Sequence, residues 1–145
     1  MGSSQRNKGA GGERELVKVL NDLGFDVHRG YVFYHEPDVI GIPGIHIECK
    51  RVEKLDIKKA MEQAISESKK KDGGTPCVFH RVNRKPWMVT MRDIDWLELF
   101  QHSGCLLFDY FHLENKLVTT LLDEWAHYYK VFNDMETDGS LTDER

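Results

Sequence analysis

The sequence is poor in cysteine and proline and has no long hydrophobic run. Its 145 residues include three cysteines and four prolines. The cysteines are far apart in the chain, and their odd number argues against a disulfide framework and against a zinc site. No apolar stretch approaches the roughly 18 residues of a membrane-spanning helix, and the polar, glycine-rich start does not look like a signal peptide. We therefore expect one domain with a cytoplasmic location and no membrane partner.

The acidic net charge argues at first against a nucleic-acid partner, but the charge is unevenly distributed. The formal net charge is −4. Residues 1–92 hold 17 Lys and Arg against 12 Asp and Glu, a net of +5, whereas residues 93–145 hold 3 against 12, a net of −9. Each basic cluster alone is typical of a solvated surface, but together they favour a phosphate-facing surface. The residues that we assign to such a nucleic-acid-binding surface are Arg6, Lys8, Arg51, Lys54, Arg81, Arg84 and Lys85.

Hydrophobic spacing predicts an α/β domain after a flexible, glycine-rich start. Helices are expected over residues 13–23, 57–70 and 93–100. Strands are expected over residues 25–29, 38–42, 45–51, 76–82 and 86–92, the last two joined by a turn at Asn83-Arg84. After residue 100 we expect a strand at 105–111, a helix at 113–132 and a disordered acidic tail at 134–145.

The strand expected over residues 45–51 alternates between two faces. Ile45, Ile47 and Cys49 are expected to point into the core, because successive side chains of a strand lie on opposite faces. His46, Glu48 and Lys50 would then share the other face. His46 could line a groove there, although a solvent-facing strand histidine is the more frequent case. Glu48 and Lys50 alone would be an ordinary exposed ion pair, which contributes little to stability.

Asp38 gives this pair a different meaning. The turn at Pro43-Gly44 is expected to fold the preceding segment back along the strand, which brings Asp38 close to Glu48 and Lys50. Two converging carboxylates are costly unless a cation lies between them. Oxygen ligands of this kind suit Mg²⁺ or Mn²⁺, and the backbone carbonyl of Cys49 could supply a further ligand.

Glu13 lies on the shoulder of the apolar face of the first expected helix. It is therefore the acid of that helix most able to overhang the sheet. The alternative is a glutamate favoured at a helix start by the helix dipole.

These segments together resemble the PD-(D/E)XK nuclease superfamily, and within it the Holliday junction resolvase-like endonucleases of archaea and phages. The similarity runs from about residue 8 to residue 92. It is carried by Gly12-Glu13-Arg14-Glu15-Leu16, Pro37-Asp38-Val39-Ile40-Gly41 and Ile47-Glu48-Cys49-Lys50-Arg51. The resemblance implies a restriction-endonuclease-like mixed sheet flanked by helices, with a C-terminal helical extension. Residues 1–100 would form the nuclease core, and residues 101–133 would pack on it or at a dimer interface.

The resemblance also implies the roles of individual residues. Asp38 and Glu48 would bind Mg²⁺ or Mn²⁺ together with the Cys49 carbonyl. Glu13 would reach the metal directly or through a water. Lys50 would orient or deprotonate the attacking water, or hold the scissile phosphate, and Gln63 matches a glutamine that some relatives use.

The function implied is a metal-dependent, structure-selective DNA endonuclease that acts on branched DNA as a homodimer. A nicking, flap or restriction-type nuclease of the same fold is the alternative enzyme, and a module that only binds nucleic acid is the alternative of another class. The aromatic loop at residues 30–37, with Tyr31, Phe33, Tyr34 and His35, could stack on unpaired bases or form a dimer contact.

Overall fold

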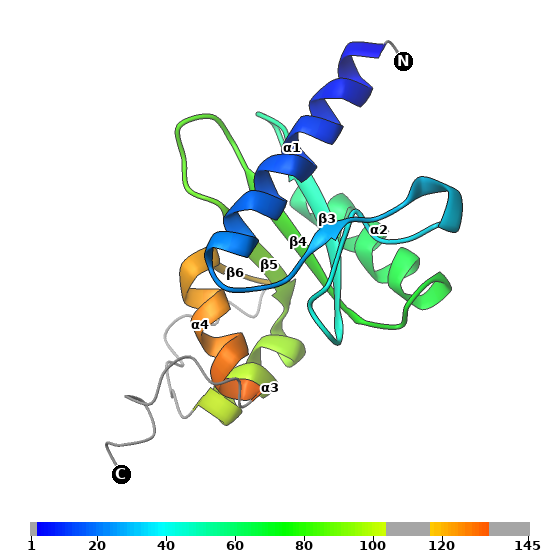
Figure 1. The fold of residues 1–145 in the computed structure, drawn as a ribbon. Coiled ribbons are helices and arrows are strands. Elements are labelled where there is room, and N and C mark those ends of the chain that lie inside the picture. The colour runs from blue at the N-terminus through cyan, green and yellow to red at the C-terminus, as the bar shows by residue number, and fades with distance from the viewer. Residues whose placement is uncertain (1–2, 104–116, 134–145) are drawn as a thin grey trace.

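The chain forms a six-stranded sheet covered by helices, as seen in a computed structural model that describes residues 3–103 and 117–133 (Figure 1). The strands lie in the sheet in chain order. They are β1 (His28–Arg29), β2 (Val39–Ile40), β3 (Ile45–Arg51), β4 (Thr75–Arg81), β5 (Met88–Arg92) and β6 (Leu117–Leu121). Only β3 and β4 run parallel, and the other neighbouring pairs are antiparallel. The expected mixed sheet is confirmed.

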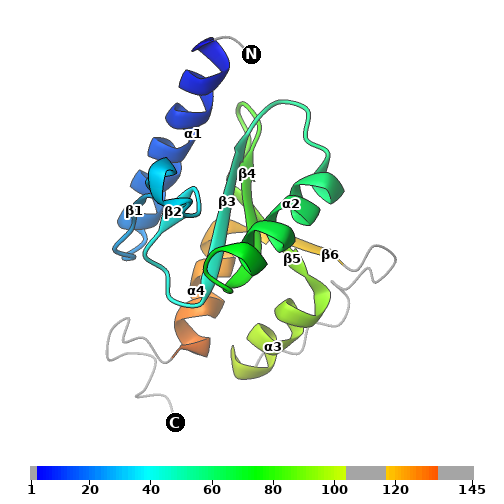
Figure 2. The same cartoon turned by 90° about the vertical axis from the view of Figure 1, so that its right-hand side faces the viewer.

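Helices cover both faces of this sheet (Figure 2). They are α1 (Ser3–Asp22), α2 (Ile57–Lys70), α3 (Asp93–Ser103) and α4 (Leu122–Phe132), with a short 3₁₀ helix, η1 (Val32–Tyr34). Leu16 and Leu20 of α1 and Trp125 of α4 belong to the core cluster on one face. On the other face, the apolar side of α2 packs on Val78 of β4. Because helices cover both sides, the central strands are buried on both faces.

β3 confirms the expected division of its side chains, with one difference. Ile45, Ile47 and Cys49 pack in the core with α1, as predicted. At positions 46 and 48 the opposite face is not open to solvent, because α2 covers it: His46 is 0% exposed and Glu48 is 3% exposed. The expectation of a solvent-facing histidine at position 46 is therefore wrong.

Helix α1 begins ten residues before the expected start, at Ser3 rather than Glu13. Gly9, Gly11 and Gly12 lie inside the helix, although each glycine costs about 1 kcal/mol there relative to alanine. Gly12 has a clear packing reason, since a Cβ atom at this position would lie 2.5 Å from Cβ of Arg51. The glycine that suggested flexibility instead allows α1 to approach β3 closely.

The single helix expected over residues 113–132 is wrong in its first part. Residues 117–121 form strand β6, which pairs with β5, and α4 begins only at Leu122. The β-branched run Val118-Thr119-Thr120 favours a strand. Within it, Val118 is buried and Thr119 lies within 2.5 Å of Thr90 across the sheet, oxygen to oxygen. Leucines at positions 117 and 121 suit helical spacing as well, so periodicity alone misleads here.

The remaining elements follow the expected pattern with ends that differ by a few residues; β1 and β2 are shorter than expected, whereas α3 runs to Ser103 rather than residue 100. β1 and β2 have two residues each, and Arg84, with a φ of 64°, lies in the turn between β4 and β5. Asp56 caps α2 as predicted by accepting a hydrogen bond from the backbone N–H of Lys59. The strand expected at 105–111 and the tail at 134–145 lie outside the described residues.

Candidate active site

The shortness of β2 places Asp38 beside the second half of β3. β2 pairs with β3 only through Val39 and Ile47. Just before β2, Oδ2 of Asp38 accepts a hydrogen bond of 2.8 Å from the backbone N–H of Cys49. The carboxylate thus takes the position that a neighbouring strand would otherwise occupy. The hairpin predicted from Pro43-Gly44 brings Asp38 to Glu48 and Lys50 as expected.

The surroundings of Asp38 disfavour its charge. Burial, and then the negative charge of Glu48, raise the pKa of Asp38 from 3.8 to about 7. The charge of Glu13 acts in the same direction, whereas the Cys49 N–H and Lys50 lower the pKa. A site that concentrates carboxylates to this degree is one that a cation would stabilise. The donor set therefore fits the metal that we expected.

The carboxylate of Glu48 is hydrogen-bonded to a buried histidine, which in turn contacts a second carboxylate. Sequence reasoning did not predict this arrangement. Nε2 of His46 lies 2.9 Å from Oε1 of Glu48, and Nδ1 of His46 lies 2.8 Å from Oδ1 of Asp72. Burial lowers the pKa of His46, but the hydrogen bonds to the two carboxylates outweigh it and raise the pKa above its ordinary value. Asp72 is 26 residues from His46 in the chain, and no local pattern connects them.

Glu13 reaches the same region from α1. Its Oε1 atom accepts a hydrogen bond from Nε of Arg29 at 3.0 Å, and the two side chains form an ion pair. Because α1 crosses β3 at Gly12, the next residue overhangs the end of the hairpin, as the sequence predicted. Arg29 was not among the predicted site residues.

Lys50 and Gln63 meet across the opening between β3 and α2. Nζ of Lys50 donates a hydrogen bond of 3.1 Å to Oε1 of Gln63. Gln63 is exposed and lies off the apolar side of α2, as its spacing indicated. The amide positions the ammonium group and leaves two of its three protons available for other acceptors.

One groove gathers these residues. Its volume is about 470 Å³. It is lined by Gly9, Glu13, Asp38, Glu48, Cys49, Lys50, Arg51, Val52 and Gln63. All of the residues predicted to be catalytic lie on its wall. Within the described ranges, no three His, Cys, Asp or Glu side chains form a complete metal-binding cluster, so a cation here would need the Cys49 carbonyl or water as well.

The thiol of Cys49 is not a candidate ligand. Burial, and then the charge of Asp38, raise the pKa of this thiol well above its usual range. A protonated thiol binds metal poorly, because the thiolate is the ligand form. Only the backbone of Cys49 therefore remains as a donor.

Arg51 and Arg81, which were predicted to bind DNA, are held by an acid of α1. Glu15 accepts hydrogen bonds from Nε of Arg51 at 3.3 Å, from Nη1 of Arg81 and from Nε1 of Trp87 at 3.1 Å. Arg51 also donates to Oδ1 of Asn83 at 2.9 Å. Arg51 nevertheless lines the groove. Sequence reasoning missed Glu15, since its partners lie on strands far along the chain.

The other residues predicted to bind DNA are less engaged. Lys54, Arg84 and Lys85 are exposed and lie after β3 or in the turn between β4 and β5. Arg6 and Lys8 lie in the first turns of α1, and their side chains are outside the description.

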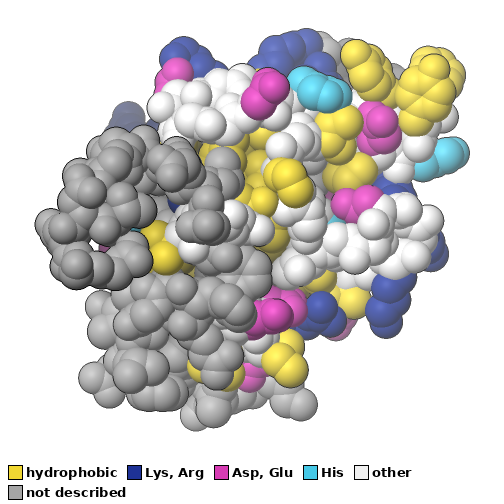
Figure 3. Space-filling view, turned by 60° about the horizontal axis from the view of Figure 1, so that its bottom comes forward, with side chains coloured by type: hydrophobic (Ala, Val, Ile, Leu, Met, Phe, Trp, Pro, Cys, Tyr) yellow, Lys and Arg dark blue, Asp and Glu magenta, His cyan; other side chains and the backbone are white. Residues whose placement is uncertain are grey.

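The aromatic segment around η1 projects into solvent. Tyr31, Val32, Phe33 and Tyr34 are 59–96% exposed. In Figure 3, hydrophobic side chains protrude on the right, the side on which the segment lies in Figure 1. Tyr34 and His35 also line a depression of about 280 Å³ whose other wall includes Lys70 and Lys71. Exposed rings beside basic residues, a few positions before Asp38, are typical of contact with bases and phosphates.

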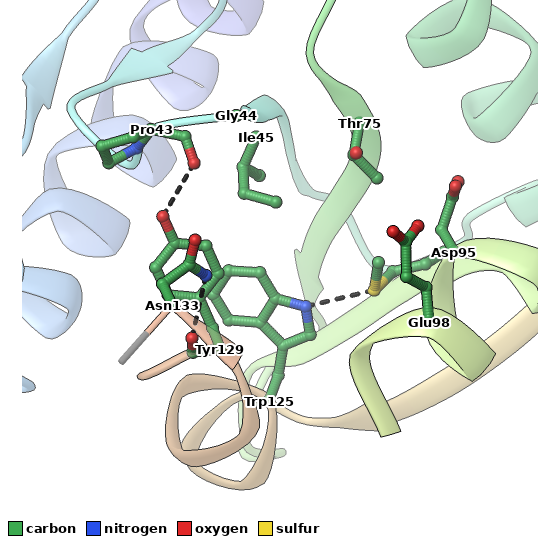
Figure 4. A pocket seen from close by; sticks show the side chains of 10 residues that line it. Pro43, Gly44, Ile45, Thr75, Asp95, Glu98, Trp125, Tyr129 and Asn133 are labelled. Atoms are coloured by element: carbon green, nitrogen blue, oxygen red, sulfur yellow. Dashed lines mark hydrogen bonds between the residues drawn. The ribbon is translucent and has the colours of Figure 1, made fainter. Parts of the chain in front are cut away.

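A second cavity of about 220 Å³ lies at the opposite end of β3 (Figure 4). Tyr129 donates a hydrogen bond of 2.7 Å to the backbone oxygen of Pro43, and Nε1 of Trp125 lies 3.1 Å from Sδ of Met91. The residues that line this cavity are not those that line the groove. These contacts tie α4 to the turn between β2 and β3 and to β5.

No curated protein sequence matches the chain significantly. Among solved structures, the Hjc Holliday junction resolvase of the archaeal hyperthermophile Archaeoglobus fulgidus is similar, with 24% sequence identity and a TM-score of 0.41 over 53% of this chain and 70% of that chain. Among the described helices, none has the length and apolar character needed to cross a bilayer.

The family comparison is more extensive. The family model described as archaeal Holliday junction resolvase (Hjc) matches residues 4–102, which include the whole groove and both strands of its hairpin. The chain therefore belongs to the archaeal Holliday junction resolvase family, whose members are structure-selective nucleases that hydrolyse DNA phosphodiester bonds.

Proposed function

We propose that this chain cuts four-way DNA junctions in the groove between α1, the β2–β3 hairpin and α2, with Mg²⁺ or Mn²⁺ as cofactor. The observation that carries the proposal is the convergence of Glu13, Asp38, Glu48, Lys50 and Gln63 on one groove. Four separate segments of the chain contribute these side chains: α1, the residue before β2, β3 and α2. A degenerate binding module would have no reason to retain all of them together.

Asp38 and Glu48 would hold the metal together with the backbone carbonyl of Cys49. The raised pKa of Asp38 supports this assignment, because a divalent cation relieves the repulsion between the two carboxylates. Glu13 would join them directly or through water. When bound, the metal supplies an activated water and stabilises negative charge on the phosphoryl oxygens.

Lys50 would act on the reacting groups themselves. Gln63 fixes its ammonium group at the groove, where it can donate to the attacking water or to an oxygen of the scissile phosphate. Arg51, which lines the same groove, would contact a neighbouring phosphate while Glu15 holds its guanidinium in place.

We further propose that two copies act together in the cytoplasm. A four-way junction presents two equivalent strands, and a dimer with a twofold axis matches that symmetry. The exposed aromatic segment 31–34 would contact unpaired bases at the branch point.

The test is cleavage of labelled DNA of defined shape in the presence of Mg²⁺. Four-way junction, flap, duplex and single-stranded substrates are compared for the wild-type protein, Asp38→Asn and Lys50→Ala. We expect paired symmetric nicks in the junction by the wild type, no cleavage by either variant, and junction binding by all three proteins.

The alternatives give different results. Cleavage of every substrate would favour a nicking, flap or restriction-type nuclease, and binding without cleavage by the wild type would favour a binding module. Metal-dependent cleavage that persists in both variants would overturn the assigned site. Glu62→Gln is a suitable control, since Glu62 is exposed on α2 next to Gln63 but does not line the groove.

A further inference from the structure

We propose that His46 is a positioning residue that, together with Asp72, fixes the carboxylate of Glu48 for metal binding. The inference rests on the proposed function, since it concerns the groove and the metal site assigned there. It adds two residues to that site, neither of which lines the groove.

The geometry of His46 is unusual for a core histidine. Its side chain is 0% exposed, and both of its ring nitrogens face carboxylates rather than backbone groups, Glu48 at 2.9 Å and Asp72 at 2.8 Å. A neutral buried imidazole needs one acceptor and one donor, and a backbone carbonyl together with a backbone N–H would satisfy that need at lower electrostatic cost. The two carboxylates are instead joined through the ring into one chain.

Glu48 is the member of the chain that reaches the groove. Its side chain is 4% exposed and lines the groove beside Asp38. Oε1 is occupied by His46, and among the described residues no hydrogen bond is found at Oε2. The ring therefore fixes the rotation of the carboxylate and leaves one oxygen for a cation. Metal-binding carboxylates commonly have such outer partners, whose loss lowers metal affinity about 10–100-fold.

Asp72 is placed by a tight turn between α2 and β4. The backbone N–H of Gly73 donates a hydrogen bond of 2.7 Å to the carbonyl of Ser68. The backbone N–H of Thr75 donates one of 2.7 Å to the carbonyl of Gly44. Gly73 has a φ of 69°, and a Cβ atom at Gly74 would lie 2.9 Å from the backbone nitrogen of His46. The turn is thus packed directly on the start of β3. Its aspartate has a fixed position from which to orient the imidazole.

Two substitutions of His46 separate positioning from packing. The amide nitrogen of asparagine is the same number of bonds from Cα as Nδ1 of histidine. His46→Asn can therefore keep the hydrogen bond to Asp72 but loses the hydrogen bond to Glu48. The amide nitrogen of glutamine corresponds in the same way to Nε2 of histidine. His46→Gln can therefore keep the hydrogen bond to Glu48 but loses the hydrogen bond to Asp72. Each variant loses one hydrogen bond at the same buried position, and each serves as the stability control for the other.

The affinity for Mn²⁺ is measured directly, in the absence of DNA, by electron paramagnetic resonance and by calorimetry. Asp38→Asn shows which part of the signal comes from the groove. We expect His46→Asn to bind Mn²⁺ about tenfold more weakly than the wild type. His46→Gln, which keeps the link to Glu48 and loses only the support from Asp72, should show a clearly smaller loss of affinity, while the melting temperatures of the two variants fall by similar amounts. Equal losses of affinity in both variants, or none in either, would overturn the inference.

Asp72 provides a second pair for the case in which substitutions of the buried ring prevent folding. Its side chain is 34% exposed, so changes there are better tolerated. Asp72→Asn retains an oxygen that can accept from Nδ1, whereas Asp72→Ala does not. We expect weaker Mn²⁺ binding for Asp72→Ala only, and equal affinities of the two variants would contradict the role assigned to this chain.

The same experiment separates this inference from the proposed function. A wild-type protein that binds Mn²⁺ at the groove but cuts no junction contradicts the function and leaves the positioning role standing on the variant affinities. A wild-type protein that cuts junctions while His46→Asn binds Mn²⁺ normally contradicts the positioning role alone. Absence of Mn²⁺ binding by the wild type overturns both.

Discussion

Asp38 links the stability of the folded chain to pH. Its pKa rises from 3.8 to about 7 on folding, chiefly because of burial. A carboxyl group whose pKa is raised binds its proton more tightly in the folded state, so its favourable contribution is complete below about pH 4 and is lost as the pH rises towards about 7. The groove therefore carries an electrostatic cost at neutral pH, which a divalent cation bound there would remove.

The first prediction concerns that cost. The wild-type protein without metal is expected to lose more stability than Asp38→Asn between about pH 4 and about pH 7, since the amide does not titrate. Denaturant unfolding at a series of pH values measures the difference. Added Mg²⁺ should remove it for the wild type only. Parallel stability curves for the two proteins would contradict the pKa assigned to Asp38.

Gly12 lies where α1 closely approaches Arg51 of β3, and this close approach is the basis of the second prediction. A Cβ atom there would overlap Cβ of Arg51, so Gly12→Ala should displace α1 and lower the free energy of unfolding by about 1–3 kcal/mol. Gly11 is a matched control in the same helix, because its Cβ would meet nothing within 4 Å. Gly11→Ala should raise stability by about 1 kcal/mol through helix propensity. Urea unfolding distinguishes the two, and equal effects would refute close approach at Gly12.

Elements differ in how well the sequence predicts them. The β2–β3 hairpin was predictable because its turn, its alternation and its paired acids are all local in the chain. The role of His46 was not predictable, because its burial depends on the packing of α2 over β3. Its partner Asp72 comes from the turn after that helix. β6 was misjudged because Leu117 and Leu121 suit both helical and strand spacing, and pairing with β5 decides between them.

Glu15 joins α1 to β3, to β4 and to Trp87 just before β5, and this cluster is the basis of the third prediction. Burial raises the pKa of Glu15, but its hydrogen bonds to Arg81 and Arg51 outweigh this and leave the pKa below 4.5. Its stabilising effect is therefore present at neutral pH and lost as the pH falls. Glu15→Gln should cost about 2 kcal/mol at neutral pH, since it leaves partly buried guanidinium groups without a counter-charge.

Thermal and denaturant unfolding would measure the loss at Glu15, with Glu62→Gln as an exposed reference. The loss should shrink in acid. A Glu15→Gln variant as stable as the wild type at neutral pH would show that the contacts of Glu15 with Arg51, Arg81 and Trp87 do not contribute to the free energy of unfolding.

The η1 segment gives the fourth prediction. Phe33 is 96% exposed, so Phe33→Ala should leave the stability of the fold unchanged. If its ring stacks on a base at the branch point, junction affinity should fall by about 1–3 kcal/mol, while duplex affinity changes little. Fluorescence anisotropy with both DNAs tests this. Unchanged junction affinity with loss of the dimer in sedimentation would assign the segment to self-association.

At the scale of the whole molecule, the uneven charge leads to the fifth prediction. Residues 134–145 hold five acidic residues and one Arg, so their removal changes the formal net charge from −4 to 0. A chain ending at residue 133 should bind random duplex more tightly, most clearly at low salt, where electrostatic terms are largest. Titrations at several salt concentrations measure the change, and identical affinities would exclude a role of the acidic residues in deterring non-specific binding.

The order of the strands has a consequence for how the protein is made. Because neighbours in the sheet are also neighbours in the chain, most strand pairing closes short loops, which favours rapid folding. The contacts of α4 are the distant ones: Tyr129 is 86 residues from Pro43, and Lys130 is 107 residues from Leu23. The residues that line the groove all precede residue 64. During synthesis, every residue that lines the groove therefore leaves the ribosome before α4, the helix whose Tyr129 contacts the turn of the hairpin.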